Sequence, residues 1–208
     1  LEVDLAQALA DIMGLELKIV EKPFSELLGA LAGDEIDLVI SGLTITPERN
    51  TKSAFVGPYY LSGQSILTRS TSLAQADEAA DLNQADLKLA ALEGSTSQRF
   101  VESKLPKATL VTTPDYDAAV KLLLADQVSA LVADREIVRL TAFLHPKDGL
   151  ATLPETLTIE PIGIAAPPGD VLLINYLENA LDALEGSGFL SALRVRWLER
   201  SDWIQQLP

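Results

Sequence analysis

The chain has 208 residues and a net charge of −14, from 30 acidic and 16 basic side chains. Hydrophobic residues make up 48% and charged residues 22%, a composition typical of a globular protein with a buried core. The acidic excess argues against binding to nucleic acid or to anionic membrane surfaces, since both require a basic surface. No apolar run approaches the roughly 18 residues of a membrane-spanning helix.

Composition also limits metal and thiol chemistry. The chain has no cysteine, which removes thiolate catalysis, disulfides and zinc–thiolate sites, and its one histidine, His145, cannot build a multi-histidine site. The sequence therefore predicts neither a metal site nor a cofactor. The lack of cysteine is compatible with either side of a membrane and does not indicate a compartment.

Predicted helices and strands alternate in the first part of the chain. Apolar spacing predicts a helix at 3–13, and strict alternation predicts a strand at 15–20. A helix at 23–32 then precedes a short apolar run at 36–40 that is typical of a buried strand. This alternation indicates an α/β fold with mostly parallel sheets and helices on their faces.

A second α/β cycle follows a polar stretch at 70–81, which has no apolar periodicity and is predicted to be a loop at a domain boundary. Its predicted elements are strands at 87–92, 109–112 and 129–133 and helices at 95–103 and 115–125. Two helices, the second at 189–198, close the chain. Extended runs at 64–69 and 159–166 predict two crossings between lobes, with lobe one at 1–66 plus 163–208 and lobe two at 67–162.

The most informative segment, SGLTITPER at 41–49, begins where a predicted buried strand ends. Thr46 suits the N-cap of a short helix, and the Thr44 hydroxyl and the Arg49 guanidinium would then lie beyond the carboxyl end of the strand, where open α/β sheets bind ligands. An arginine fork can bind both oxygens of a carboxylate. The alternative is that Arg49 is a surface residue beside Glu48 in an ordinary turn.

Together with FVGPYY at 55–60, this segment resembles the signature of the bacterial extracellular solute-binding proteins of family 3, the polar amino-acid-binding periplasmic proteins. The resemblance extends from EVDLA at 2–6 to Arg196-Trp197. It implies a two-lobed type II periplasmic-binding fold with two crossing strands as a closing hinge and a ligand site in the interlobe cleft. Family members have a strand before the segment at 2–6, so the sequence is expected to lack the family's first strand.

In lobe one, the resemblance implies that Arg49 pairs with the α-carboxylate of the ligand, and that Thr44 and the backbone at Ser41 and Gly42 add hydrogen bonds. Phe24 matches an aromatic residue that stacks over the ligand side chain. The alternative for Phe24 is a place in the core or in a hydrophobic staple.

In lobe two, the segment EGSTS resembles the family's helix opening, which implies that Ser95 and Thr96 meet the ligand at a helix N-terminus. The segment SALVAD at 129–134 resembles another family segment, which ends in an aspartate. The resemblance implies that Asp134 binds the α-ammonium group of the ligand. Simple helix capping is the alternative at both places. The chain departs from the family pattern at Ser95, often Thr, and at Ser129, usually Asp.

The resemblance implies a non-catalytic amino-acid receptor, periplasmic or otherwise extracytoplasmic and either free or membrane-tethered, that delivers its ligand to an ABC permease. Leu92 and Ala133 flank the expected clamp and add no charge, which disfavours an acidic ligand side chain. A second hypothesis is a cyclohexadienyl-type dehydratase on the same scaffold, with Glu93 as general acid. A third is the ligand-sensing domain of a membrane receptor, kinase or channel, in which the tail at 201–208 leads to a membrane segment.

Overall fold

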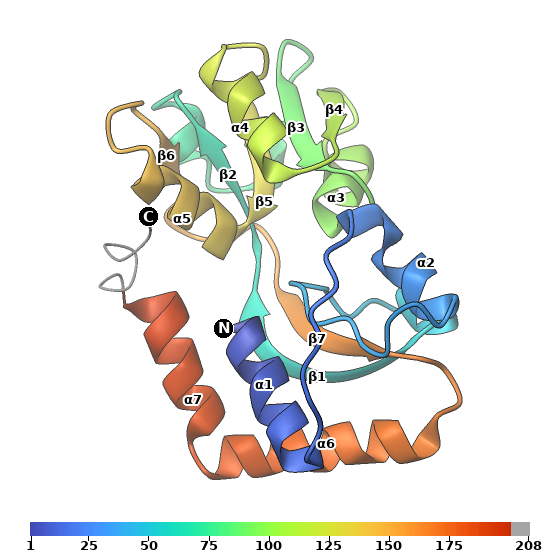
Figure 1. Ribbon diagram of the computed structural model, residues 1–208. Coiled ribbons are helices and arrows are strands. Elements are labelled where there is room, and N and C mark those ends of the chain that lie inside the picture. Colours follow the sequence, from blue (N-terminus) through green and yellow to red (C-terminus); the bar gives the residue numbers. More distant parts are fainter. Residues whose placement is uncertain (201–208) are drawn as a thin grey trace. The chain divides into compact units, whose positions relative to one another are not determined.

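The computed structural model describes residues 1–200, and the chain divides into two compact units (Figure 1). Unit 1 contains Leu1–Lys22, Leu27–Leu61 and the chain from Pro161 onward, and unit 2 contains Pro23–Glu26 and Ser62–Glu160. The predicted lobe boundaries, after residues 66 and 162, differ from this division, which also assigns Pro23–Glu26 to unit 2.

Unit 2 is built on a five-stranded mixed sheet in the order β4-β3-β5-β2-β6. Strand β3 pairs in parallel with β4 and β5, whereas β2 is antiparallel to β5 and to β6. The strands are β2 (Gln64–Thr68), β3 (Lys88–Leu92), β4 (Thr109–Thr113), β5 (Ala130–Asp134) and β6 (Ala151–Thr152). The strands predicted at 87–92, 109–112 and 129–133 are therefore present.

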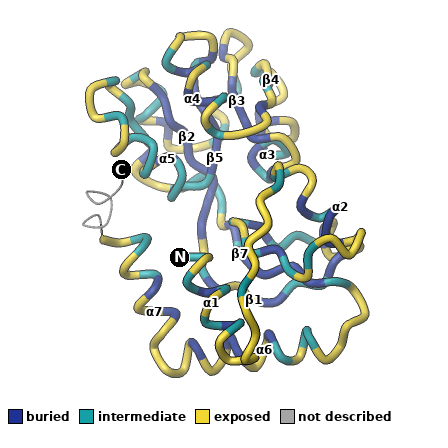
Figure 2. Tube along the Cα trace, viewed as in Figure 1, coloured by how far each residue is buried: buried dark blue, intermediate teal, exposed yellow. Residues whose placement is uncertain are grey.

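Helices cover both faces of this sheet and bury two separate apolar clusters. Neighbouring residues of one strand point to opposite faces, so Ile66 packs in the cluster of Phe100 from α3, and Leu67 in the cluster of Val120 from α4. Figure 2 shows β2 and β5 buried along most of their length. The helices are α3 (Thr96–Lys104), α4 (Tyr116–Leu124) and α5 (Arg135–Leu144). The segment at 70–81, which was predicted to be a loop, contains a short 3-10 turn at Leu73–Gln75 and most of a second one at Ala79–Leu82.

Unit 1 contains a two-stranded sheet of β1 (Ala54–Ser62) and β7 (Glu160–Ala166). Its core joins Tyr59 and Ile162 of these strands to Leu5 and Leu177 of the helices. The helices are α1 (Glu2–Met13), α2 (Leu27–Ala32), α6 (Val171–Gly186) and α7 (Phe189–Arg194), with a π-helical turn at Val195–Glu199 after α7. The predicted tail element at 201–208 lies outside the described residues.

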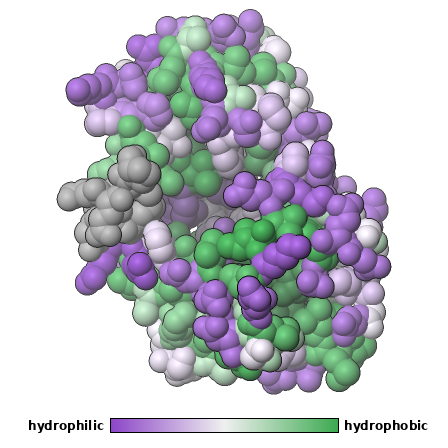
Figure 3. Space-filling model, viewed as in Figure 1, coloured by the Kyte–Doolittle hydropathy of each residue, from purple (hydrophilic) through white to green (hydrophobic). Residues whose placement is uncertain are grey.

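Three predicted elements of the first part of the chain form differently. The segment at 15–20 is extended but pairs with no strand, and Leu15 and Ile19 are 58% and 59% exposed. In Figure 3, hydrophobic residues shown in green form part of the surface of unit 1. Alternation makes a strand only where a neighbour accepts its hydrogen bonds. The segment at 36–40 makes one isolated bridge, Val39 to Ala165, and the helix at 23–32 is a 3-10 turn followed by α2.

Candidate functional site

In unit 1, Arg49 is held by its own turn. Its backbone N–H donates to Thr46 Oγ1 at 3.2 Å, and the Asn50 N–H donates to the Thr46 carbonyl at 3.0 Å. The N-cap residue of the short 3-10 helix Arg49–Thr51 is Glu48, so the prediction of Thr46 as the N-cap is wrong, although its side chain does accept the Arg49 N–H. The Arg49 guanidinium donates from Nη1 to the Thr44 carbonyl at 2.8 Å, and the residue is only 5% exposed. Arg49 is therefore not a surface residue, which was the alternative in the sequence analysis.

The loop before Arg49 is fixed by a carboxylate that the sequence analysis did not single out. The Gly42 N–H donates to Glu2 Oε1 at 2.5 Å, and Gly42 has a φ of +60°, which favours glycine. Thr44 is buried and forms an isolated antiparallel bridge with Ile162, whereas Ser41 is exposed. Because Glu2 accepts the Gly42 amide, that N–H is not open to a ligand in this arrangement.

The same oxygen of Glu2 receives a second donor. The Tyr59 hydroxyl donates to Glu2 Oε1 at 2.7 Å from a fully buried position on β1. Burial raises the pKa of Tyr59, and the nearby Glu2 carboxylate raises it further. The phenol therefore stays protonated and donates at neutral pH, and Glu2 ties α1 to the loop at Gly42.

In unit 2, Ser95 caps helix α3. Its hydroxyl accepts from the Gln98 N–H at 3.1 Å and donates to the Leu92 carbonyl at 2.6 Å. The hydroxyl thus has a donor and an acceptor from its own turn. Capping, the structural alternative for this position, is present; direct ligand contact by Ser95 stays a prediction.

Asp134 holds a different place in its turn. It is the N-cap residue of α5, yet its side chain makes no capping hydrogen bond, so the expectation that it caps this helix is wrong. Its Oδ1 instead accepts from Gln64 Nε2 at 3.2 Å, and the same nitrogen donates to Thr96 Oγ1 at 3.2 Å. Burial raises the pKa of the neighbouring Tyr116 phenol, and the Asp134 carboxylate adds to this increase.

Thr96, Asp134 and Gln64 meet at one end of the strands in the sheet of unit 2. Thr96 follows the carboxyl end of β3, Asp134 ends the parallel strand β5, and Gln64 begins the antiparallel strand β2. Phe24 belongs to the short segment assigned to unit 2 and is half-buried; its neighbour Ser25 lies so close that a Cβ on Gly94 would be 3.2 Å from its Cα. The sequence analysis did not predict a role for Gln64. The only indication in the sequence is that a polar residue stands at the start of a strand that is otherwise largely apolar.

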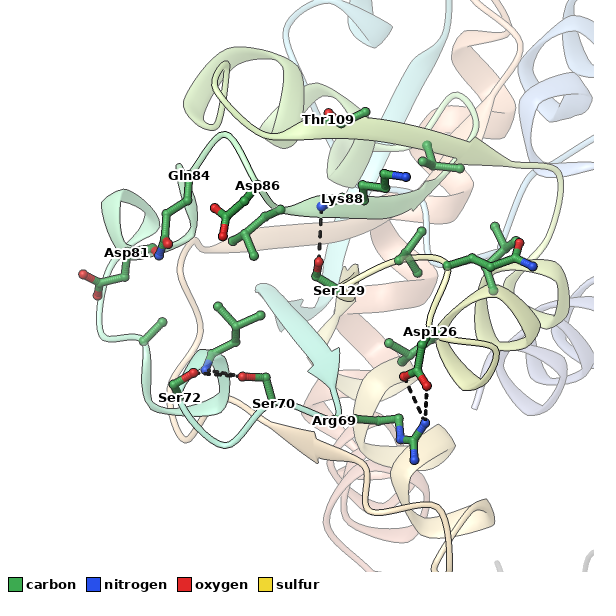
Figure 4. A pocket seen from close by; sticks show the side chains of 18 of the residues that line it. Arg69, Ser70, Ser72, Asp81, Gln84, Asp86, Lys88, Thr109, Asp126 and Ser129 are labelled. Carbon is green, nitrogen blue, oxygen red and sulfur yellow. Dashed lines mark hydrogen bonds and ion pairs between the residues drawn. The ribbon is translucent and has the colours of Figure 1, made fainter.

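A large open depression, with a volume of about 1410 Å³, lies at the other end of these strands, where β3 and β4 begin (Figure 4). Its lining includes Lys88 at the start of β3, Thr109 at the start of β4 and Ser129 just before β5. Arg69 and Asp126, also in its lining, form an ion pair at 3.0 Å. The predicted ligand residues do not line this depression.

Two general findings concern the part of the chain from residue 1 to residue 200. No group of three or more His, Cys, Asp or Glu side chains there could hold a metal ion. No helix in the same range has the length and apolar character needed to cross a bilayer.

Comparison with known proteins decides the family. The model of the bacterial extracellular solute-binding proteins, family 3, matches residues 1–200. The chain belongs to this family. Its similarity to solved amino-acid-binding proteins also shows the type II periplasmic-binding fold, including a TM-score of 0.89 and 29% identity to an ABC transporter binding component from Wolinella succinogenes solved with lysine, over 98% of this chain and 88% of that one.

Two curated relatives differ in what they do. The chain is 28% identical to the ABC transporter arginine-binding protein 1 of Escherichia coli, over 94% of this chain and 80% of that protein. It is 27% identical to the cyclohexadienyl dehydratase of Pseudomonas aeruginosa, over 95% of this chain and 74% of that protein. The chain is thus about equally similar to a binding protein and to an enzyme.

Proposed function

We propose that this solute-binding protein binds a free amino acid outside the cytoplasm and delivers it to an ABC permease. Arg49 and Thr44 of unit 1 would bind the α-carboxylate, and Asp134 of unit 2 would bind the α-ammonium group. Two opposite charges at separate places select zwitterions over simple acids or amines. The named ligands of the relatives, arginine and lysine, support an amino acid as the ligand class.

The observation that carries this proposal is the state of Asp134. A strand-terminal aspartate that caps a helix accepts a backbone N–H of the first turn. Asp134 makes no such bond, and its carboxylate is instead oriented by the neutral amide of Gln64. A carboxylate at this position can accept a charge-assisted hydrogen bond from the ammonium group of a ligand.

The direct test is isothermal titration calorimetry with each proteinogenic L-amino acid, on wild type and on Asp134→Asn. Losing a charge-assisted hydrogen bond should weaken binding by about one to two decades. Asp115→Asn is the matched control, because Asp115 does cap its helix by accepting the Ala118 N–H at 2.6 Å. The control should lower stability and leave affinity unchanged. Failure of wild type to bind any amino acid would overturn the proposal.

The side-chain preference is predicted from the residues beside Asp134 and Thr96. Leu92 and Ala133 are buried and apolar, so they bring no cation that an acidic ligand side chain would need. We therefore expect L-glutamine to bind more tightly than L-glutamate in the same titrations. Tighter binding of glutamate would contradict this expectation.

Delivery to a permease is the part of the proposal that concerns a partner. It rests on the family and on relatives that are components of ABC transporters. The test is uptake of a radiolabelled amino acid by proteoliposomes containing the permease. Uptake should depend on added wild-type protein and fall with Asp134→Asn.

The dehydratase relative favours one alternative function, elimination of water from a cyclohexadienyl substrate on the same scaffold. Glu93 is the candidate acid; it follows β3 and is exposed. The discriminating experiment mixes the protein with prephenate and follows phenylpyruvate absorbance. Steady turnover that Glu93→Gln abolishes would replace the binding proposal with catalysis, and we expect none.

A further inference from the structure

Gln64 is a polar side chain at the start of a strand that is buried along its length. The residue is 0% exposed and lies directly opposite Asp134 in the antiparallel register of β2 and β5. Residues paired in this way have neighbouring side chains on one face of the sheet. Its Nε2 donates to both Asp134 Oδ1 and Thr96 Oγ1, each at 3.2 Å. One amide thus joins two of the proposed ligand residues of unit 2.

The backbone that carries this amide is fixed by the returning chain. The Gln64 N–H donates to Thr158 Oγ1 at 2.9 Å, and the Gln64 carbonyl accepts the Leu157 N–H at 2.8 Å. A Cβ on the preceding Gly63 would lie 2.2 Å from the Thr158 carbonyl oxygen, so the two segments pass with no room for a side chain. The amide therefore reaches Asp134 from a well-anchored position.

Asp134 also determines which way the amide points. The reversed amide would place Oε1 against the carboxylate, where two acceptors repel, so Nε2 faces Asp134. Both N–H groups of Nε2 are then used, and Oε1 is buried with no hydrogen-bond partner within residues 1–200. A buried acceptor without a partner destabilises the folded state. An apolar side chain of similar length would avoid this cost, so folding alone does not favour glutamine here.

We propose that Gln64 is a positioning residue for the ligand's ammonium group and acts through Asp134; this inference rests on the proposed function. The amide donates to the carboxylate and orients it, but as a neutral group it does not cancel the negative charge. A lysine or arginine at the same place would pair with Asp134 and compete with the ligand's ammonium group. The same amide also fixes the position of the Thr96 hydroxyl.

The test compares wild type with Gln64→Met, which removes both donated hydrogen bonds with little change in volume. The probes are the proteinogenic L-amino acids and, for each one that wild type binds, the acid that lacks the α-amino group. We expect Gln64→Met to weaken amino-acid binding by roughly 10-fold or more, the equivalent of one hydrogen bond to a charged group. Its affinity for the deaminated acid should equal that of wild type, and its melting temperature should be unchanged or higher.

A matched control comes from the other end of the same strand. Thr68 is also 0% exposed, and its hydroxyl donates to the Ser129 carbonyl at 2.8 Å. Thr68→Val should therefore lower the melting temperature without changing amino-acid affinity. Gln64→Glu, which places a second carboxylate against Asp134, should lower both the affinity and the melting temperature.

The outcomes separate this inference from the proposed function. Wild-type affinity in Gln64→Met, an equal loss for amino acids and deaminated acids, or a loss that follows a lower melting temperature would each make Gln64 a structural residue. The proposed function would then stand without this inference. If wild type binds no amino acid, both fail together.

Discussion

The two units carry their proposed ligand residues on different kinds of structure. In unit 1, Thr44 and Arg49 lie outside the sheet strands, in a segment held by buried polar contacts to the Arg49 side chain and to Glu2. In unit 2, Thr96 begins a helix and Asp134 ends a strand of a five-stranded sheet with its own apolar clusters. The proposed assignment therefore predicts that ligand binding and folding depend on the same side chains in unit 1 and on different side chains in unit 2.

The largest expected effect tests the unit 1 half of this comparison. Arg49→Ala should reduce amino-acid affinity by about 100-fold or more. The substitution removes the guanidinium group and leaves the carboxylate of the ligand without a cationic partner. It should also lower the free energy of unfolding by about 1–3 kcal/mol, since the Thr44 carbonyl loses a buried donor. Calorimetry and denaturant unfolding on the same preparations measure both effects.

Arg49→Lys refines the same test. Lysine keeps the charge but loses the planar pair of donors, so affinity should fall by about one to two decades. Arg69→Lys is the matched control, because Arg69 is an exposed arginine of unit 2 that pairs with Asp126. Normal binding by the Arg49 variants would show that Arg49 is a structural residue and would contradict the carboxylate assignment.

Glu2→Gln is the next largest change, and it tests whether the loop of unit 1 depends on a charge. The amide oxygen can still accept from Gly42 and Tyr59, but bonds to a neutral acceptor are weaker, so stability should fall by about 1–2 kcal/mol. Affinity should fall less than in the Arg49 variants, because Glu2 acts on the loop and not on the ligand. Glu16→Gln, on the exposed segment after α1, is the control. Unchanged stability in Glu2→Gln would refute this account.

Ser95→Ala tests the separation expected in unit 2. Loss of this N-cap should cost about 1 kcal/mol of stability. Affinity should be nearly unchanged, because the hydroxyl already bonds to the Leu92 carbonyl and the Gln98 N–H. A loss of affinity without a loss of stability would show instead that Ser95 contacts the ligand.

The same contrast explains how much of the fold could be predicted. Strands β3 and β5 of unit 2 contain the apolar runs LAAL at 89–92 and ALVA at 130–133, and Ser95 and Asp115 mark the helix starts that the structure contains. In unit 1 the segment at 15–20 has strand alternation but no neighbouring strand. A local sequence pattern shows which structure a segment can form. Whether a strand finds a partner depends on segments far away in the sequence, which the periodicity of the strand does not reveal.

Prediction of the candidate site was limited in a similar way. Arg49 and Asp134 can be proposed from the sequence because they end segments that resemble a family signature. The sequence shows Glu2 only as part of a segment that matches the family, and no feature of the sequence indicates the contact between Gln64 and Asp134. Both act through contacts with residues far away in sequence, and no local spacing indicates such a partner.

The smallest expected effect comes from an exposed ion pair of unit 1. Glu185 near the end of α6 accepts from Arg194 Nη2 at 2.6 and 2.8 Å, and Arg194 Nη1 also donates to the Tyr59 carbonyl at 3.0 Å. The hydrogen bond from Arg194 holds the pKa of Glu185 below its usual value. Because the Glu185 side chain is half exposed, Glu185→Gln should change stability at pH 7 by less than about 1 kcal/mol.

The pH dependence of this pair has a definite sign. A carboxyl group with a lower pKa in the folded state stabilises that state above its unfolded pKa, and this contribution disappears as the pH falls through the folded pKa. Wild type should therefore be slightly more stable than Glu185→Gln at pH 7, and the two should converge in acid below the folded pKa of Glu185. Denaturant unfolding of both proteins across this range measures the difference. A gap that persists or widens in acid would mean that Glu185 stabilises unit 1 through packing and not through its charge.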